Sequence, residues 1–273
     1  YVGNGSDTVD IDVNLGWEPT WLLVKQTVNS GNWQLVDSAA HWPVSGNWET
    51  IRPNNNQAAY FATETGIQLT PTGFKIVKNW GNFNTNGDTH VFIAIRRSDG
   101  YVGKPPDAGT DVFNIVYGDS GDGTISTEPS FEPTNFAVDM GLIRAPNSTQ
   151  DWPISTRLTS GLQLLTNTTG AESTNSNAQF DYASGWNAYD GNNTSNISWM
   201  WKRHAGFDVQ RYTGQTGQQS REHLLNAVPE MIWAKSTNNA YNWAIGHKGL
   251  TGGWTSKHLR FTSSAEITGQ QFA

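Results

Sequence analysis

The feature of this sequence that most constrains its fold is a set of short motifs that recur in the same order. Each set opens with a tyrosine closely followed by glycine and continues with a Pro-led apolar segment. The two motifs begin at Tyr1 and Pro19, at Tyr117 and Pro133, and at Tyr212 and Pro229. The separation of tyrosine and proline is nearly the same in all three sets, so the register is almost constant. Such recurrence predicts tandem copies of one unit, an arrangement more typical of fibres and multivalent binders than of one-site enzymes.

Further motifs extend the match between the copies. A tryptophan opens a short strand-like run in each copy, at Trp33, Trp152 and Trp243. The separation of proline and tryptophan is equal in the first and third copies and longer in the second, and we assign the extra residues to a loop at 145–151. The first two copies also share a Gly-aromatic pair and a late apolar run. These lie at Gly73-Phe74 and Gly185-Trp186, and at 90–97 and 196–203.

The order of the motifs divides the chain into two complete copies and one partial copy. We predict repeats at residues 1–104 and 105–206 and a partial repeat at 207–273, with a Pro-containing linker at 98–112. The partial copy has no counterpart of the late apolar run. The first copy lacks the apolar run that precedes the tyrosine in the other two. Because unpaired strand edges invite further pairing, we expect a longer repeat protein or another subunit to supply the missing strands.

Composition excludes several classes of protein. Charged residues make up only 15% of the 273 residues, the net charge is −7, and basic residues cluster no further than adjacent pairs, which argues against a nucleic-acid partner. No apolar run is long enough to predict a membrane span. Cysteine is absent, so a disulfide framework and Cys-based chemistry are excluded.

Short alternating apolar runs separated by Gly, Asn and Pro predict an all-β fold. We expect tandem antiparallel β-sandwiches of the jelly-roll or concanavalin A-like kind, with about six to eight strands in each complete copy. Period-two alternation assigns one face of each strand to a core. The predicted core positions are Leu22, Val24, Phe136, Val138, Ile93 and Trp199.

The opposite face of the Pro-led strands varies between copies but is also apolar in places. It carries Trp21 and Leu23 in the first copy and Met231 and Trp233 in the third. A broad apolar face of this kind is poorly suited to water. We therefore expect the chain to self-associate into a homo-oligomer.

No residue pattern predicts catalysis. Asp10 and Asp12 share one strand face, but the other copies have no matching acid pair, and charges at a sheet edge are the better interpretation. The six histidines lack metal-ligand spacing, and no nucleophile elbow or phosphate loop occurs. We predict no catalytic residue, no metal site and no cofactor.

Aromatic rings on polar loops are the remaining candidates for binding. Trp80 lies in a segment that also contains Asn82 and Asn84, and Trp48 and Trp254 lie in Gly-rich turns. A ring flanked by amide groups is suited to stacking on a sugar and bonding its hydroxyls. The alternative is that these rings cap the ends of the sandwiches or pack against a neighbouring unit.

The order of these motifs resembles that in repeat domains of virion structural proteins from tailed phages of marine and cyanobacterial hosts. The similarity covers nearly all of the first two copies and, in the third, the segment 212–273. It implies concanavalin A-like sandwiches in a non-enzymatic tail-fibre or particle-surface component of the virion. Its expected partners are other copies, other virion proteins and host-surface glycans. The resemblance supplies no catalytic residues.

Two other functions stay open from the sequence. A secreted carbohydrate-binding module or bacterial adhesin would use the same Trp and Asn loops. A glycoside-acting enzyme would need two acids brought together by the fold.

Overall fold

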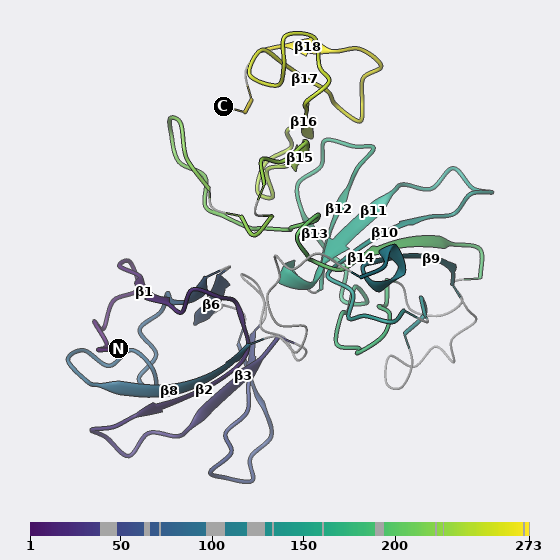
Figure 1. The fold of residues 1–273 in the computed structure, drawn as a ribbon. Coiled ribbons are helices and arrows are strands. Elements are labelled where there is room, and N and C mark those ends of the chain that lie inside the picture. The colour runs from purple at the N-terminus through teal and green to yellow at the C-terminus, as the bar shows by residue number, and fades with distance from the viewer. Residues whose placement is uncertain are drawn as a thin grey trace.

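The computed structural model of the chain is all-β and antiparallel, as predicted (Figure 1). It describes residues 1–38, 48–62, 66–70, 72–96, 107–118, 129–132, 134–159, 161–188, 194–221, 223–225, 227–269 and 271–272. The helices in this part of the chain are two 3-10 turns, η1 (Gly109–Asp111) and η2 (Arg157–Thr159). The described strands form three groups, β1–β8, β9–β14 and β15–β18, which pair only within a group. We call these groups, with their loops, units 1, 2 and 3.

Unit 1 is a sandwich of two three-stranded sheets. One sheet has the order β1-β7-β6 and the other β3-β2-β8, with a β4-β5 hairpin beside them. Leu22 and Val24 from one sheet pack against Phe74 and Ile76 from the other, and all four are at most 1% exposed. The bounds are β1 (Ile11–Asn14), β2 (Pro19–Gln26), β3 (Gln34–Asp37), β4 (Trp48–Thr50), β5 (Tyr60–Ala62), β6 (Ile67–Thr70), β7 (Gly73–Ile76) and β8 (His90–Arg96).

Unit 2 has a six-stranded sheet with the order β13-β12-β11-β10-β14-β9. Its second layer is made of loops joined by isolated bridges, such as Phe131 to Trp186. Phe136 and Val138 are buried between the layers, as predicted, but they precede β10 instead of lying within it. The bounds are β9 (Phe113–Tyr117), β10 (Met140–Arg144), β11 (Pro153–Thr156), β12 (Leu162–Leu165), β13 (Ser173–Thr174) and β14 (Ile197–Trp201).

Unit 3 consists of two small hairpins that pack on unit 2. β15 (Met231–Ala234) pairs with β16 (Ala244–His247), and β17 (Lys257–His258) pairs with β18 (Ile267–Thr268). Trp243 packs against Met140 and Ile154 of the unit 2 sheet. Its indole Nε1 donates a hydrogen bond to the carbonyl oxygen of Leu165 at 2.9 Å. Unit 3 therefore covers part of the outer face of unit 2.

The predicted inward direction of Ile93 and Trp199 is wrong. Ile93 is 57% exposed, while its neighbours Phe92 and Ala94 pack against the unit 1 core. In β14 the buried residues are Ser198 and Met200. Both faces of these strands are apolar enough to fit a core, so alternation alone identifies two faces without saying which is buried.

The strand pairing of unit 1 recurs in unit 2. Leu23 pairs with Leu35 on one side and Ile93 on the other, and Leu142 pairs in the same way with Ile154 and Trp199. This register equates β2 with β10 and β8 with β14. The connections from Leu23 to Leu35 and from Leu142 to Ile154 then have equal length, so the extra residues of the second copy lie before β10. Their assignment to the loop at 145–151 is therefore wrong. The interpretation of units 1 and 2 as repeats stays a prediction, and the shared register supports it.

A size exchange accompanies the shared register. In unit 1, Leu22 and Phe74 share the core, whereas unit 2 has Gly141 and Trp186 at the places that the predicted repeat makes equivalent. A Cβ atom added to Gly141 would lie 2.1 Å from the Trp186 ring. The Trp186 ring therefore occupies the space that a side chain at position 141 would fill.

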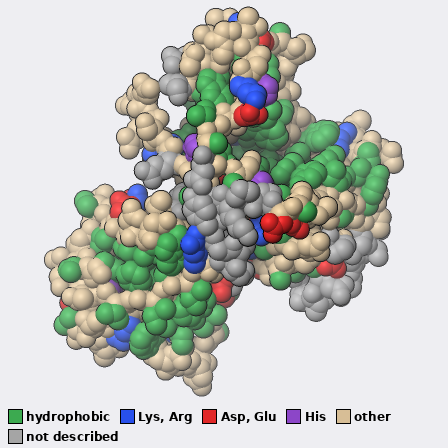
Figure 2. Space-filling model, viewed as in Figure 1, with side chains coloured by type: hydrophobic (Ala, Val, Ile, Leu, Met, Phe, Trp, Pro, Cys, Tyr) green, Lys and Arg blue, Asp and Glu red, His purple; other side chains and the backbone are tan. Residues whose placement is uncertain are grey.

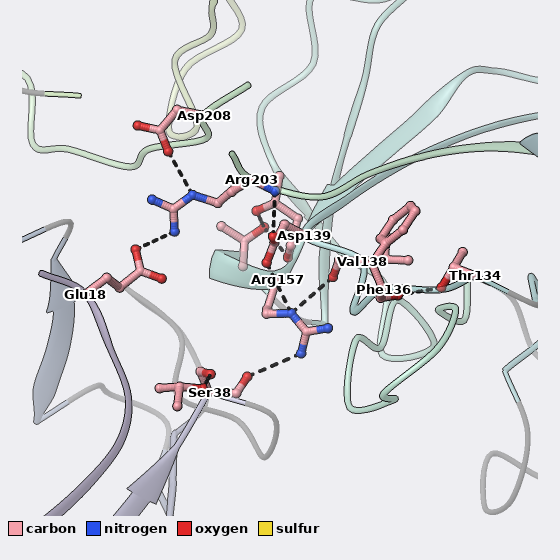
Figure 3. A network of polar contacts seen from close by, with 12 residues as sticks. Glu18, Ser38, Thr134, Phe136, Val138, Asp139, Arg157, Arg203 and Asp208 are labelled. Atoms are coloured by element: carbon pink, nitrogen blue, oxygen red, sulfur yellow. Dashed lines mark hydrogen bonds and ion pairs between the residues drawn. The ribbon is translucent and has the colours of Figure 1, made fainter. Parts of the chain in front are cut away.

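A buried ion-pair network joins units 1 and 2 (Figure 3). Arg203, which is 2% exposed, lies between the carboxylates of Glu18 in unit 1 and Asp208 in the segment that leads to unit 3. Its backbone N–H donates to Asp139 Oδ2 at 2.7 Å. Nearby, the guanidinium of Arg157 donates to the Ser38 carbonyl of unit 1 at 3.4 Å. Charges buried in this way need partners in defined positions, so the network fixes how the units meet.

The unit 1 core contains a histidine whose burial makes folding sensitive to acid. His90 stacks on the Tyr1 ring with centroids 4.9 Å apart, and its Nδ1 lies 3.0 Å from the Asp88 carbonyl. Burial lowers the pKa of His90 from 6.5, as does Lys25, although Asp88 acts in the opposite direction. Because the folded pKa is below the unfolded one, the unfolded chain binds more protons as the pH falls through 6.5.

We therefore expect the stability that neutral His90 provides to be present above the unfolded pKa of 6.5 and to be lost as the pH falls below it toward the lower folded pKa. A His90→Phe variant keeps an aromatic ring over Tyr1. When its free energy of unfolding is measured with urea at each pH, the slope of that free energy against pH should be smaller than in the wild-type chain. Burial also lowers the pKa of His204, so some acid sensitivity should remain. An unchanged slope in the variant would contradict the assignment.

Candidate functional site

A pocket of about 370 Å³ opens on unit 1 between β3, the β4-β5 hairpin and the loop that precedes β8. Its volume falls within the range typical of small-ligand sites, roughly 300 to 1,000 Å³. Aromatic rings and uncharged polar groups make up most of its surface, together with one arginine. The lining residues are Gln34, Thr50, Arg52, Tyr60, Asn79, Trp80, Gly81, Asn82 and Phe83.

Two aromatic rings shape the wall of the pocket. Trp80 is half-buried and meets Tyr60 edge to face, with ring centroids 6.0 Å apart. Trp80 also stacks on the buried Phe83, with ring centroids 5.9 Å apart. A Cβ atom at Gly66 would lie 3.1 Å from both of the stacked rings, so the glycine leaves room for them. These ring contacts hold Trp80 in place, and the half-buried side chain leaves part of the ring accessible.

The polar groups of the pocket come from β3 and from the hairpin. Gln34 is 2% exposed, and its Oε1 accepts a hydrogen bond from Thr50 Oγ1 at 3.1 Å. The Gln34 Nε2 and the Arg52 Nε are buried and have no hydrogen-bond partner among the described residues. The Arg52 guanidinium lies over the Tyr60 ring at 5.0 Å. A buried donor without a partner costs free energy. Both side chains are therefore candidates to donate hydrogen bonds to a ligand or water in the pocket.

Of the two amides predicted to flank Trp80, only Asn82 lines the pocket. Its Oδ1 accepts from the Asn32 backbone N–H at 3.1 Å. Asn84 is fully buried, so the prediction that it contacts a ligand is not met. Its Oδ1 accepts from the Asn4 backbone, and its Nδ2 donates to the carbonyls of Ser6 and Lys78. Asn84 instead ties the loop to the N-terminal segment.

The other two predicted tryptophans lie outside the loop that carries Trp80. Trp48 opens β4 and does not lie in a turn, which corrects the prediction; its side chain is outside the described residues. Trp254 lies in a turn, as predicted, but in unit 3. The turn contains Gly252 and Gly253, both at φ 76°, and the Trp254 ring packs over Gly246.

The described lining of the pocket offers no acid for glycoside chemistry, because none of those residues is an Asp or Glu. Asp10 and Asp12, the pair noted in the sequence, both lie beside Lys75, at 3.5 and 3.3 Å. In the described part of the chain, no three His, Cys, Asp or Glu side chains gather as metal ligands. None of the helices described is long and apolar enough to cross a membrane.

Sequence reasoning identified Trp80 and Asn82 but missed Gln34, Arg52 and Tyr60. One signal was present for Gln34. It shares the core-facing side of β3 with Val36, so a polar side chain stands where alternation expects an apolar one. Tyr60 and Arg52 reach the pocket only through the β4-β5 hairpin, whose pairing the motif order does not reveal.

Fold and pocket together define an all-β sandwich protein with a ligand-sized pocket built on unit 1. The sequence matches the family described as "Domain of unknown function (DUF7483)" over residues 1–98 and 121–273, and the chain belongs to this family. No curated protein and no solved structure matches the chain.

Proposed function

We propose that this protein is a non-enzymatic virion structural component, of the tail-fibre or particle-surface kind, that contacts glycans through the Trp80 pocket. The observation that carries the glycan contact is the combination of a supported, partly accessible Trp80 ring with amide groups on the same pocket. Aromatic faces stack on sugar rings, and amides donate to and accept from sugar hydroxyls.

The virion assignment rests on the motif order described above. The repeated pairing register of units 1 and 2 supports it, because tandem units present several weak sites together and gain avidity. A secreted carbohydrate-binding module is the second candidate, since the same pocket would serve it. Mass spectrometry of purified phage particles separates the two: a virion component is found in the particles, whereas a secreted module is found only in the medium.

A glycoside-acting enzyme is the third candidate, and the pocket argues against it. Hydrolysis needs two carboxyl groups, about 5 to 10 Å apart, flanking the scissile bond. The described pocket lining offers no carboxylate. Incubation of the chain with each bound glycan should therefore release no reducing sugar, and a release that exceeds the buffer control would overturn the non-enzymatic assignment.

Truncation of the Trp80 ring should abolish glycan binding. In native gels that contain soluble polysaccharides, we expect the wild-type chain to be retarded by at least one polysaccharide. Trp80→Ala should weaken that binding by at least about tenfold, because loss of a central aromatic contact costs about 1 to 2 kcal/mol or more. Trp254→Ala is the matched control, since this ring lies in unit 3 and should leave retardation unchanged. Equal losses in the two variants would count against the pocket.

A further inference from the structure

The described lining of the Trp80 pocket contains one cation, Arg52, and its charge meets no carboxylate of the described residues. Its Nη1 donates instead to the neutral side chain of Gln57, whose Oε1 lies 3.3 Å away. The buried Arg203, in contrast, contacts two carboxylates. A half-buried guanidinium beside a ligand-sized pocket is well placed to receive an anionic group, because its planar N–H donors fit such oxygens.

The buried polar atoms of the pocket that lack described partners call for an acceptor. They are Gln34 Nε2 and Arg52 Nε, and both are hydrogen-bond donors. A sugar hydroxyl can accept a hydrogen bond, but an ionised acid group accepts more strongly, since a bond between two charged groups is shorter and stronger than a neutral one. These donors therefore favour an acid group over a hydroxyl.

The shared register puts a leucine in unit 2 at the place of the arginine. Ile51 bridges β3 at Leu35, and Leu164 pairs with β11 at the residue of the same register. Arg52, which follows Ile51, thus takes the place of Leu165. Because this place accepts an aliphatic side chain in unit 2, the fold does not require a cation there. A role in ligand recognition explains the arginine better than a role in the fold.

The chain as a whole does not attract anions, because its net charge is −7. On the face of the molecule in Figure 2, the Lys and Arg side chains of the described residues are scattered among hydrophobic and uncharged ones. A general attraction between a basic surface and a polyanion is therefore not expected. A preference for an anionic glycan would report on a local cation.

We propose that the Trp80 pocket selects glycans that carry an acid group, a uronic carboxylate or a sulfate ester, and that Arg52 receives this group. The sugar ring would stack on Trp80, while Arg52 and Gln34 donate hydrogen bonds to the acid oxygens. The inference rests on the proposed glycan contact and adds the chemical class of the ligand.

The test compares matched pairs of fluorescent oligosaccharides that differ only in the acid group. One pair is an oligogalacturonate and the same oligosaccharide with its carboxylates reduced to hydroxymethyl groups; the other is a sulfated dextran oligosaccharide and its unsulfated form. Anisotropy titrations of the full chain should show saturable binding. The anionic member of at least one pair should bind at least about tenfold more tightly than the neutral member. The pair that shows the preference identifies the acid group.

Arg52→Leu gives unit 1 the residue type that unit 2 has at this place. It should weaken binding of the preferred anionic oligosaccharide by at least about tenfold and leave binding of its neutral partner unchanged. Arg52→Lys keeps the charge and should retain part of the preference. The matched control is Arg221→Leu. Arg221 also lies over a tyrosine ring, that of Tyr212 at 4.7 Å, but it is exposed and outside the pocket lining. This variant should bind like the wild-type chain.

Each way of failing has its own result. Equal binding of the two members of both pairs, with Trp80→Ala abolishing it, leaves the glycan contact standing and overturns the choice of an acid group. A preference that persists in Arg52→Leu, or that Arg221→Leu loses equally, overturns the role of Arg52. No binding of any oligosaccharide counts against the glycan contact itself and overturns this inference with it. The comparison within each pair needs no variant, so it holds even where a substitution disturbs folding.

Discussion

Replacement of Arg203 by methionine is expected to lower the free energy of unfolding by about 3 to 5 kcal/mol, because it leaves buried carboxylates without their cation. The side chains of Glu18 and Asp208 are each only 4% exposed, so neither can recover its hydration by moving into water. Glu18 belongs to unit 1, and thus the loss also weakens the contact between the units. Urea unfolding followed by tryptophan fluorescence measures the effect.

The matched control is Lys248→Met in unit 3. Lys248 pairs with Glu230 across a hairpin, but the two side chains are 59% and 69% exposed. Exposed pairs contribute little because water and salt screen them, so this variant should unfold at an unchanged urea concentration. A loss for Arg203→Met no larger than that of the control would contradict the buried network.

Gly141→Leu should be the most damaging single change in unit 2. The added side chain would enter the space of the Trp186 ring, which lies 2.1 Å from the first added atom, and overpacking on this scale costs about 3 kcal/mol or more. Trp186→Phe alone should cost about 1 to 3 kcal/mol, since it leaves a cavity and removes the indole N–H that donates to Ser198 Oγ at 2.9 Å.

The double variant reproduces the combination of unit 1, where a leucine and a phenylalanine belong to one core cluster. We therefore expect the double variant, Gly141→Leu with Trp186→Phe, to lose less free energy of unfolding than the two single variants lose together. The difference should be about 1 to 3 kcal/mol. The comparison of all three variants by urea unfolding checks this coupling. Strict additivity would mean that the two cores are not built alike, and it would count against the repeat interpretation.

The sequence was sufficient to predict the strands that carry the strongest alternation. The apolar runs at β2, β3 and β8 are strands, and the match between the late runs at 90–97 and 196–203 is the register that pairing shows for β8 and β14. These elements are predictable because period-two alternation and turn residues are local signals. The expected linker at 98–112 lies mostly outside the described residues.

The choice of buried face was not predictable from local signals. On β8, His90 and Phe92 are inside because Tyr1 and Phe74 meet them there, with the two phenylalanine rings 5.1 Å apart. On β14, Ser198 is inside because it accepts the Trp186 indole hydrogen bond. Such partners come from distant parts of the chain, whereas a residue-by-residue ranking of hydrophobicity prefers the isoleucines and tryptophans.

The candidate site was predictable only in part, for the same reason. Trp80 and Asn82 share one loop, so their proximity follows from the sequence. Gln34, Arg52 and Tyr60 join them through tertiary contacts between β3, the β4-β5 hairpin and that loop. Asn84 looked equivalent to Asn82 in the sequence, but its amide is fully used by backbone groups.

The most direct test of the proposed glycan contact is fluorine NMR of the chain labelled with 5-fluorotryptophan, titrated with a panel of glycans. The chain has 13 tryptophans, and single substitutions assign their resonances. We expect at least one glycan to shift the Trp80 resonance in a saturable manner and to leave that of Trp254 unchanged. A panel that moves no resonance, or that moves other tryptophans and not Trp80, would contradict it.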